Sequence, residues 1–208
     1  MTARSLTLPF DQPPAAGSGD TLGAGTCSDA EPPDPARSLV VDVVVGDDDW
    51  SAFGDAPGAV ADAAAALCAT RALIDGRCEA VVALSGDDEV ARLNGTYRGS
   101  PMPTNVLSFP APPSRWPPQV RPDARRPLGD IILARETLLR EAADLGIPPR
   151  HHLQHLVVHG LLHLLGYDHE TEAAAAIMEA LEAEILARLG ITNPYDDAAH
   201  SAAQPGQR

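Results

Sequence analysis

The sequence predicts an α+β fold, a compact single domain in which helices pack on a mixed four-stranded sheet. Two observations lead to this prediction. Short aliphatic runs with the length of strands alternate with helical stretches, and the last three predicted elements are all helices. Apolar residues make up 44% of the 208 residues, which is enough to form the core of one domain.

Four segments have the pattern of strands. Leu39–Val45 (LVVDVVV) is β-branched and continuous, as in a buried strand, and Cys78–Leu84 is similar. Asn105–Phe109 predicts a short strand that Pro110 ends, because proline cannot donate to the sheet. Leu128–Leu133 predicts the fourth strand.

Helices are expected after or between these strands. We expect them over Pro57–Ile74, from a capping box at Ser85 and Asp88 to about Leu93, over Arg135–Leu145, from Pro148 to about Leu165, and over Glu172–Leu189. In the last helix, apolar residues with i, i+4 spacing predict the face that packs on the core: Ile177, Leu181, Ile185 and Leu189.

The two ends of the chain differ from the middle in composition. Residues 1–37 hold six prolines with many Gly, Ala, Ser and Asp residues and no periodicity, so we expect a disordered N-terminal extension. Residues 193–208 resemble it and predict a disordered tail. The folded domain is therefore expected over residues 38–192, with a long loop where seven prolines fall between Pro110 and Pro127.

Charge and cysteine content narrow the classes of partner and compartment. The net charge is −14, yet no lysine is present, and nine arginines against five acids make the stretch from Arg92 to Arg150 positive. Such a stretch can contact phosphates, although on charge alone solvated surface charge is the favoured explanation. The three cysteines lack metal-ligand spacing, and no run is long and apolar enough for a signal peptide or a membrane span. We expect a cytoplasmic protein without membrane association.

The most informative stretch is HLVVHGLLHLLGYDHE, from His155 to Glu170. On a helix, His159 and His163 lie about 40° apart in rotation and about 6 Å apart along the axis, so both imidazoles can reach one ion. His169 would point elsewhere if the helix continued. Gly166 predicts that the helix stops, because glycine readily takes the left-handed conformation of a helix C-terminus. The chain could then bring His169 back to the same ion.

Three histidine ligands with one open position are typical of a catalytic zinc site, in which water becomes a nucleophile near neutral pH. The sequence therefore predicts one zinc ion at the end of this helix, bound by His159, His163 and His169. His155 is expected to support the site rather than bind the metal. The other histidines are expected at the surface: His151, His152 and His200.

The segment HGLLHLLGYDH (His159–His169) resembles the signature of the YbeY-type endoribonucleases, also called rRNA maturation factors. Other stretches agree in order and spacing: LNGTYRG (Leu93–Gly99), PTNVLSFP (Pro103–Pro110), LGDIIL (Leu128–Leu133) and MEALEAEIL (Met178–Leu186). The resemblance covers about residues 40–195, which is nearly all of the predicted fold. This sequence departs from the family pattern at Asn105, where many members of the family have Asp.

This resemblance implies a compact α+β fold, a zinc ion on the three histidines and endoribonuclease activity specific for single strands. It also implies a role in 16S rRNA 3′-end maturation and in quality control of the small ribosomal subunit. The expected partners are single-stranded RNA, 16S rRNA and the small ribosomal subunit. Binding to DNA is not expected. The family's functionally important arginine corresponds to Arg98, whose guanidinium could bind phosphate through two hydrogen bonds.

Two other functions remain open on the residues alone. The protein could be a ribosome-assembly factor in which the metal is structural, or a metal-dependent hydrolase of another substrate, such as a peptide. Against a peptidase stands Gly160, because metalloproteases with an HExxH motif carry their catalytic glutamate at that position.

Overall fold

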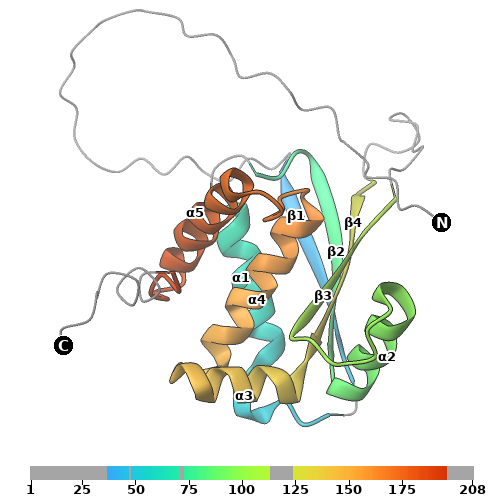
Figure 1. Ribbon diagram of the computed structural model, residues 1–208. Coiled ribbons are helices and arrows are strands. Elements are labelled where there is room, and N and C mark those ends of the chain that lie inside the picture. The colour runs from blue at the N-terminus through green and yellow to red at the C-terminus, as the bar shows by residue number, and fades with distance from the viewer. Residues whose placement is uncertain (1–36, 47, 71–72, 113–123, 196–208) are drawn as a thin grey trace, which may run out of the picture. The chain divides into compact units, whose positions relative to one another are not determined.

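A computed structural model of the chain describes residues 37–46, 48–70, 73–112 and 124–195 (Figure 1). The expectations for residues 1–36, for the tail beyond 195 and for most of the proline-rich loop lie outside these residues. The described elements are β1 (Ser38–Val45), a short 3-10 helix (Ser51–Phe53), α1 (Ala56–Cys68), β2 (Arg77–Ser85), α2 (Asp87–Arg98), β3 (Val106–Pro110), β4 (Arg126–Ala134), α3 (Arg135–Leu145), α4 (Pro149–Leu164) and α5 (Glu172–Arg188).

The four strands form one mixed sheet, as predicted, and their order in it is β1-β2-β4-β3. β1, β2 and β4 run parallel, and β3 pairs antiparallel with β4, with Leu107 opposite Ile132. β3 is therefore an edge strand that has only one neighbour in the sheet. No described strand pairs with its other edge, so that edge and one of its faces remain available to line a site.

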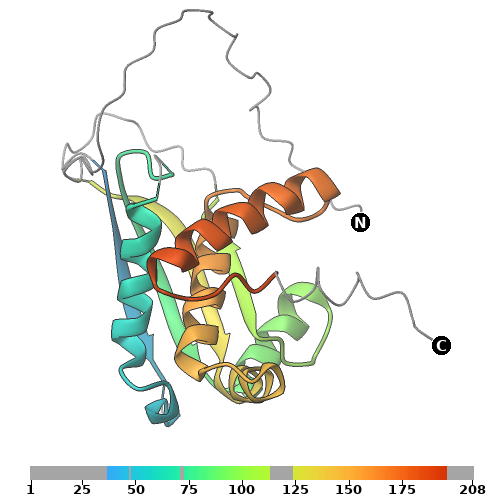
Figure 2. The same cartoon turned by 90° about the vertical axis from the view of Figure 1, so that its left-hand side faces the viewer.

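Helices cover the two faces of the sheet unequally. α1 and α4 pack on one face and α5 lies across them, whereas α2 lies on the other face (Figures 1 and 2). Alternate residues of β2 point into the main core beneath α1 and α4: Cys78, Ala80, Val82 and Leu84. A smaller cluster under α2 contains Val90, Leu107, Ile132 and Ala134. Because successive side chains of a strand point to opposite faces of the sheet, the strands contribute to both cores.

The first helix ends earlier than its composition predicts. α1 stops at Cys68, and the Thr70 hydroxyl donates to the Ala66 carbonyl at 2.8 Å just after it. Ile74 is buried without being helical, since it enters the core from the connection to β2. The apolar pattern correctly predicted burial there but not secondary structure.

The capping box at Ser85 was a wrong prediction, because Ser85 is the last residue of β2 and pairs with Ala134. α2 begins at Asp87 and receives its cap from another helix. The Asp87 N–H donates to Glu136 of α3 at 2.9 Å, and the Thr137 N–H donates to the Asp87 carboxylate at 3.0 Å. These groups lie about fifty positions apart in sequence, so a local motif could not reveal the reciprocal cap.

The buried face of α5 is rotated from the predicted stripe. Ile177 is 57% exposed, and the neighbouring Met178 is buried in its place. The buried side chains of this helix are Met178, Leu181, Glu182, Ile185 and Leu186. One of them is therefore an acid. Within the described ranges no helix is both long enough and apolar enough to cross a membrane.

Candidate metal centre and its cleft

Three histidines meet where α4 ends. The possible ligand nitrogens of His159, His163 and His169 all lie within 4.8 Å of one another. The Nε2 atoms of His159 and His163 are 3.0 Å apart. Two nitrogens bound to one tetrahedral zinc ion at about 2.05 Å would lie about 3.3 Å apart. The three side chains that the spacing singled out could therefore hold a metal ion.

The helix stops at Gly166 as predicted. Gly166 has a φ of 93°, in the left-handed region that favours glycine. Its N–H donates to the His163 carbonyl at 3.0 Å, and the Tyr167 N–H donates to the Leu162 carbonyl at 3.0 Å. These two bonds form a Schellman motif. The chain turns back at this point, which brings His169 into the cluster.

Both candidate ligand histidines of α4 have their second ring nitrogen paired with an acceptor. Nδ1 of His163 lies 3.0 Å from the Tyr167 carbonyl oxygen, and Nδ1 of His159 lies 2.7 Å from Oε1 of Glu182. A carbonyl or carboxylate oxygen accepts, so each Nδ1 carries the proton and each Nε2 presents a lone pair to the cluster. Histidines that bind metals are held in this way. Burial, with His159 and His169 nearby, also lowers the pKa of His163, which favours a neutral imidazole.

Glu182 of α5 is a functional candidate that the sequence did not reveal. Its side chain is fully buried and accepts hydrogen bonds from His159, from Nε2 of His155 at 3.1 Å and from the hydroxyl of Tyr195. Burial alone would raise the pKa of Glu182, but these bonds outweigh it and lower the pKa to about 2. Burial of the hydroxyl and, after it, the hydrogen bond to the Glu182 carboxylate raise the pKa of Tyr195. The only available signal was an acid on the apolar face of α5.

The histidines outside the cluster differ from expectation in one case. His155 bonds to Glu182, and this contact is compatible with the supporting position expected for it. His152 was expected at the surface, but its side chain is buried and its Nε2 lies 2.8 Å from Glu141 of α3. His151 is half-buried, and His200 lies outside the described residues.

Glu141 also explains why asparagine suits position 105. The Asn105 side-chain amide donates to the Glu141 carboxylate at 3.1 Å, and its oxygen accepts from the Val106 N–H at 2.8 Å. An aspartate in the same place would bring two carboxylates together, which costs free energy unless one is protonated. The asparagine at position 105, where many family members have aspartate, is thus compatible with the nearby carboxylate of Glu141.

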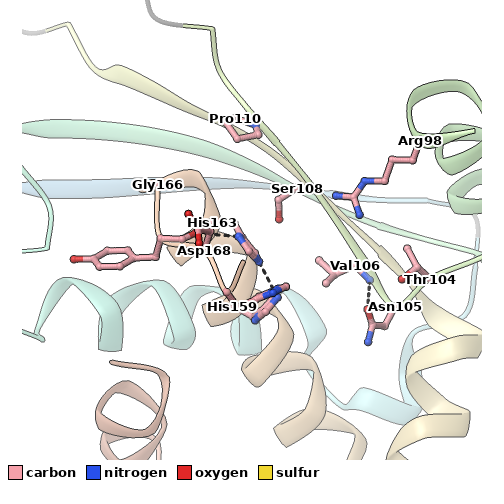
Figure 3. A pocket seen from close by; sticks show the side chains of 12 residues that line it. Arg98, Thr104, Asn105, Val106, Ser108, Pro110, His159, His163, Gly166 and Asp168 are labelled. Carbon is pink, nitrogen blue, oxygen red and sulfur yellow. Dashed lines mark hydrogen bonds between the residues drawn. The ribbon is translucent and has the colours of Figure 1, made fainter. Parts of the chain in front are cut away.

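A cleft of about 460 Å³ opens beside the three histidines. The imidazoles and the turn after α4 form one wall, and β3 with the end of α2 forms the other (Figure 3). Its lining is largely polar: Arg98, Thr104, Asn105, Val106, Ser108, Pro110, His159, His163, Gly166, Tyr167, Asp168 and His169.

Arg98 belongs to the wall opposite the histidines. It occupies the last turn of α2, which extends five residues beyond the predicted end at Leu93, and its guanidinium points toward β3 (Figure 3). Arg98 is exposed, and within the described part of the chain no acid forms a salt bridge with it. A positive guanidinium thus lies in the cleft wall opposite the cluster, with no salt-bridge partner among the described residues.

Gly160 lies on the sheet side of α4 rather than in the cleft. A Cβ atom at this position would lie 2.9 Å from Cδ1 and 3.1 Å from Cγ2 of Ile131 on β4. A glutamate at position 160 would therefore start toward the sheet, away from the cleft that the histidines line. This geometry agrees with the inference that the HExxH mechanism does not apply.

Comparison with known proteins places the chain in a family. The family model described as endoribonuclease YbeY matches residues 56–190. The endoribonuclease YbeY of Rhodopseudomonas palustris strain BisB5 is 44% identical over 185 residues, which cover 88% of this chain and 95% of the relative. That of Azorhizobium caulinodans is 48% identical over 158 residues, which cover 76% of this chain and 96% of the relative. The resemblance in the histidine and arginine motifs predicted these matches. Because they span most of both proteins, the chain belongs to the YbeY endoribonuclease family.

Proposed function

We propose that the protein is a zinc-dependent endoribonuclease, specific for single-stranded RNA, that acts in 16S rRNA 3′-end maturation and in quality control of the small ribosomal subunit. The observation that carries the proposal is the arginine facing three convergent histidines across one cleft. The family's name and the relatives' names support RNA as the substrate class. The catalytic domain is residues 38–192, and its setting is the cytoplasm.

The ligand set favours zinc. His159, His163 and His169 offer three imidazole nitrogens, and no acid belongs to the cluster among the described residues. Imidazole suits zinc well, and three protein ligands leave a fourth position for water or substrate, as in catalytic zinc sites. Zinc bound there would supply a Lewis acid that activates the attacking group and polarises the phosphate.

The chain's own residues would hold the RNA backbone. The guanidinium of Arg98 can donate two parallel hydrogen bonds to phosphate oxygens and stabilise the charge that develops on them during cleavage. Ser108 and Thr104, on the same wall, offer hydroxyl groups to the backbone. A phosphodiester between this wall and the histidines would contact both.

The test is cleavage of an end-labelled RNA, single-stranded or annealed to its complement, by zinc-loaded protein. We expect the wild type to cut the single strand and His163→Ala to be inactive. Arg98→Gln should lose about 10²-fold in cleavage rate, the usual scale for one electrostatic stabiliser, with its zinc content and melting temperature unchanged. Arg98→Lys should recover only part of the loss, because an ammonium lacks the planar two-point contact.

Arg92→Gln is the matched control. Arg92 is exposed on the same helix but pairs with Glu89 at 2.6 Å and does not line the cleft, so its replacement should leave cleavage unchanged. Equal cleavage by wild type and His163→Ala would reveal a contaminating nuclease. If the zinc-loaded wild type binds RNA without cutting it, the assembly factor with a structural metal is the better explanation.

A further inference from the structure

Glu182 is the most enclosed polar group beside the candidate metal centre. Its carboxylate is fully buried, and it accepts hydrogen bonds from side chains of two separate segments. Oε1 accepts from Nδ1 of His159 at 2.7 Å, whereas Oε2 accepts from Nε2 of His155 at 3.1 Å and from Tyr195. An ionised carboxylate this far from water is costly unless it is fully hydrogen-bonded, so the arrangement calls for a role.

We propose that Glu182 is a positioning residue for the metal centre, which selects the tautomer of His159 that can bind the ion. The inference rests on the proposed function only in taking His159 as a metal ligand. A neutral imidazole carries one N–H, and the carboxylate can only accept, so the proton of His159 lies on Nδ1. Nε2, which faces His163, then keeps the lone pair that a metal requires.

The remaining bonds of Glu182 fix the carboxylate itself. Because His155 and Tyr195 both donate to Oε2, the group cannot rotate without breaking two hydrogen bonds. Tyr195 lies beyond the end of α5, so the segment after this helix contributes to the orientation of a ligand on α4. His155 accordingly acts through Glu182 and not as a ligand.

His163 provides an internal comparison. Its Nδ1 donates to the backbone carbonyl of Tyr167, which no side-chain substitution removes directly. Of the two ligands on α4, only His159 therefore depends on a side-chain acceptor. Substitution of Glu182 should impair one ligand and leave the orientation of the other intact.

Glu182→Gln tests the tautomer with little change of shape. An amide can turn its NH₂ group toward Nδ1 of His159, which would place the imidazole proton on Nε2 and block metal binding. We expect zinc affinity, measured by competition with a chelator on the full chain, to fall about 10- to 100-fold, the usual range for such supporting residues. Tyr195→Phe removes one hydrogen-bond donor to Glu182 but leaves the Glu182 carboxylate as acceptor for His159, so zinc affinity should fall less. Glu172→Gln, at an exposed position in the first turn of α5, should bind zinc as the wild type does.

A second measurement does not depend on the variant folding. Long-range ¹H–¹⁵N correlation spectra of the zinc-free wild type, recorded above the titration range of histidine, report which ring nitrogen carries the proton. We expect the proton of His159 on Nδ1. A proton on Nε2, or wild-type zinc affinity in folded Glu182→Gln, would overturn the proposal. Neither measurement uses RNA cleavage, so failure of the proposed enzymatic activity would be seen separately.

Discussion

Replacement of Gly166 by valine separates the cost of backbone strain from damage to the metal centre. Gly166 has a φ of 93°, a conformation that a β-branched residue strongly disfavours. The strain should cost about 1–3 kcal/mol of unfolding free energy. For a domain of this size a cost of about 2 kcal/mol lowers the melting temperature by about 4–8 °C.

The same substitution should also weaken zinc binding. If the chain relieves the strain by changing φ, the Tyr167 carbonyl leaves Nδ1 of His163 and His169 no longer returns to the cluster. Loss of one ligand or of one ligand's orientation should reduce zinc affinity about 10-fold or more. The zinc-induced rise in melting temperature should shrink accordingly, because it depends on the ratio of free zinc to the dissociation constant.

Gly146→Val is a matched control at the end of α3. Gly146 has a φ of 66°, its N–H donates to the Ala143 carbonyl, and the next N–H donates to the Ala142 carbonyl, which is the same pair of bonds as at Gly166. Thermal denaturation with and without zinc should show similar destabilisation of both zinc-free variants but weaker zinc binding only in Gly166→Val. If both variants bind zinc as the wild type does, the end of α4 does not determine where His169 lies.

Three further predictions concern the metal, the chain end and pH. His169→Ala should lose the bound zinc in metal analysis, and full occupancy would contradict the three-ligand centre. Deletion of residues 1–36 should leave melting temperature and zinc content unchanged, because their composition offers too little apolar burial to offset the entropy of ordering; a clear drop in either would show that they pack on the domain. Burial outweighs the hydrogen bond to Glu141 and lowers the pKa of His152 below its ordinary 6.5. The unfolded chain then binds the His152 proton more tightly than the folded chain does. The contribution of His152 to the free energy of unfolding should therefore be fully present above about pH 6.5 and should be lost as the pH falls below that value. His152→Gln should flatten this slope of melting temperature against pH, and an unchanged slope would assign it to other groups.

Local patterns predicted the elements that position the candidate metal centre. The β-branched runs, the helix over Arg135–Leu145 and the stop at Gly166 all depend on residues close in sequence, and the structure confirms them. The convergence of the three histidines was predictable for the same reason, since all three fall within one helix and the turn after it.

What the sequence could not show depends on contacts between distant segments. The acid that bonds to His159 lies 23 positions away on another helix, and the predicted apolar stripe of that helix does not include Glu182. His152 likewise looks like a surface residue until Glu141 supplies its partner. The end of α1 was overestimated because Ile74 is apolar and buried, yet burial does not require a helix.

The missing side chain at position 160 has a consequence for the dimensions of the cleft. Without a Cβ atom there, α4 approaches Ile131 of β4 more closely than a helix with any other residue could. His159 and His163 belong to this helix. On the opposite wall of the cleft, Ser108 belongs to β3 and Arg98 to α2. Gly160 therefore lets α4 pack directly on the Ile131 side chain, behind the wall of the cleft that the imidazoles form. A methyl group at that position would meet Ile131, and unless this side chain gave way it would push α4 outward and widen the cleft without touching any residue that lines it.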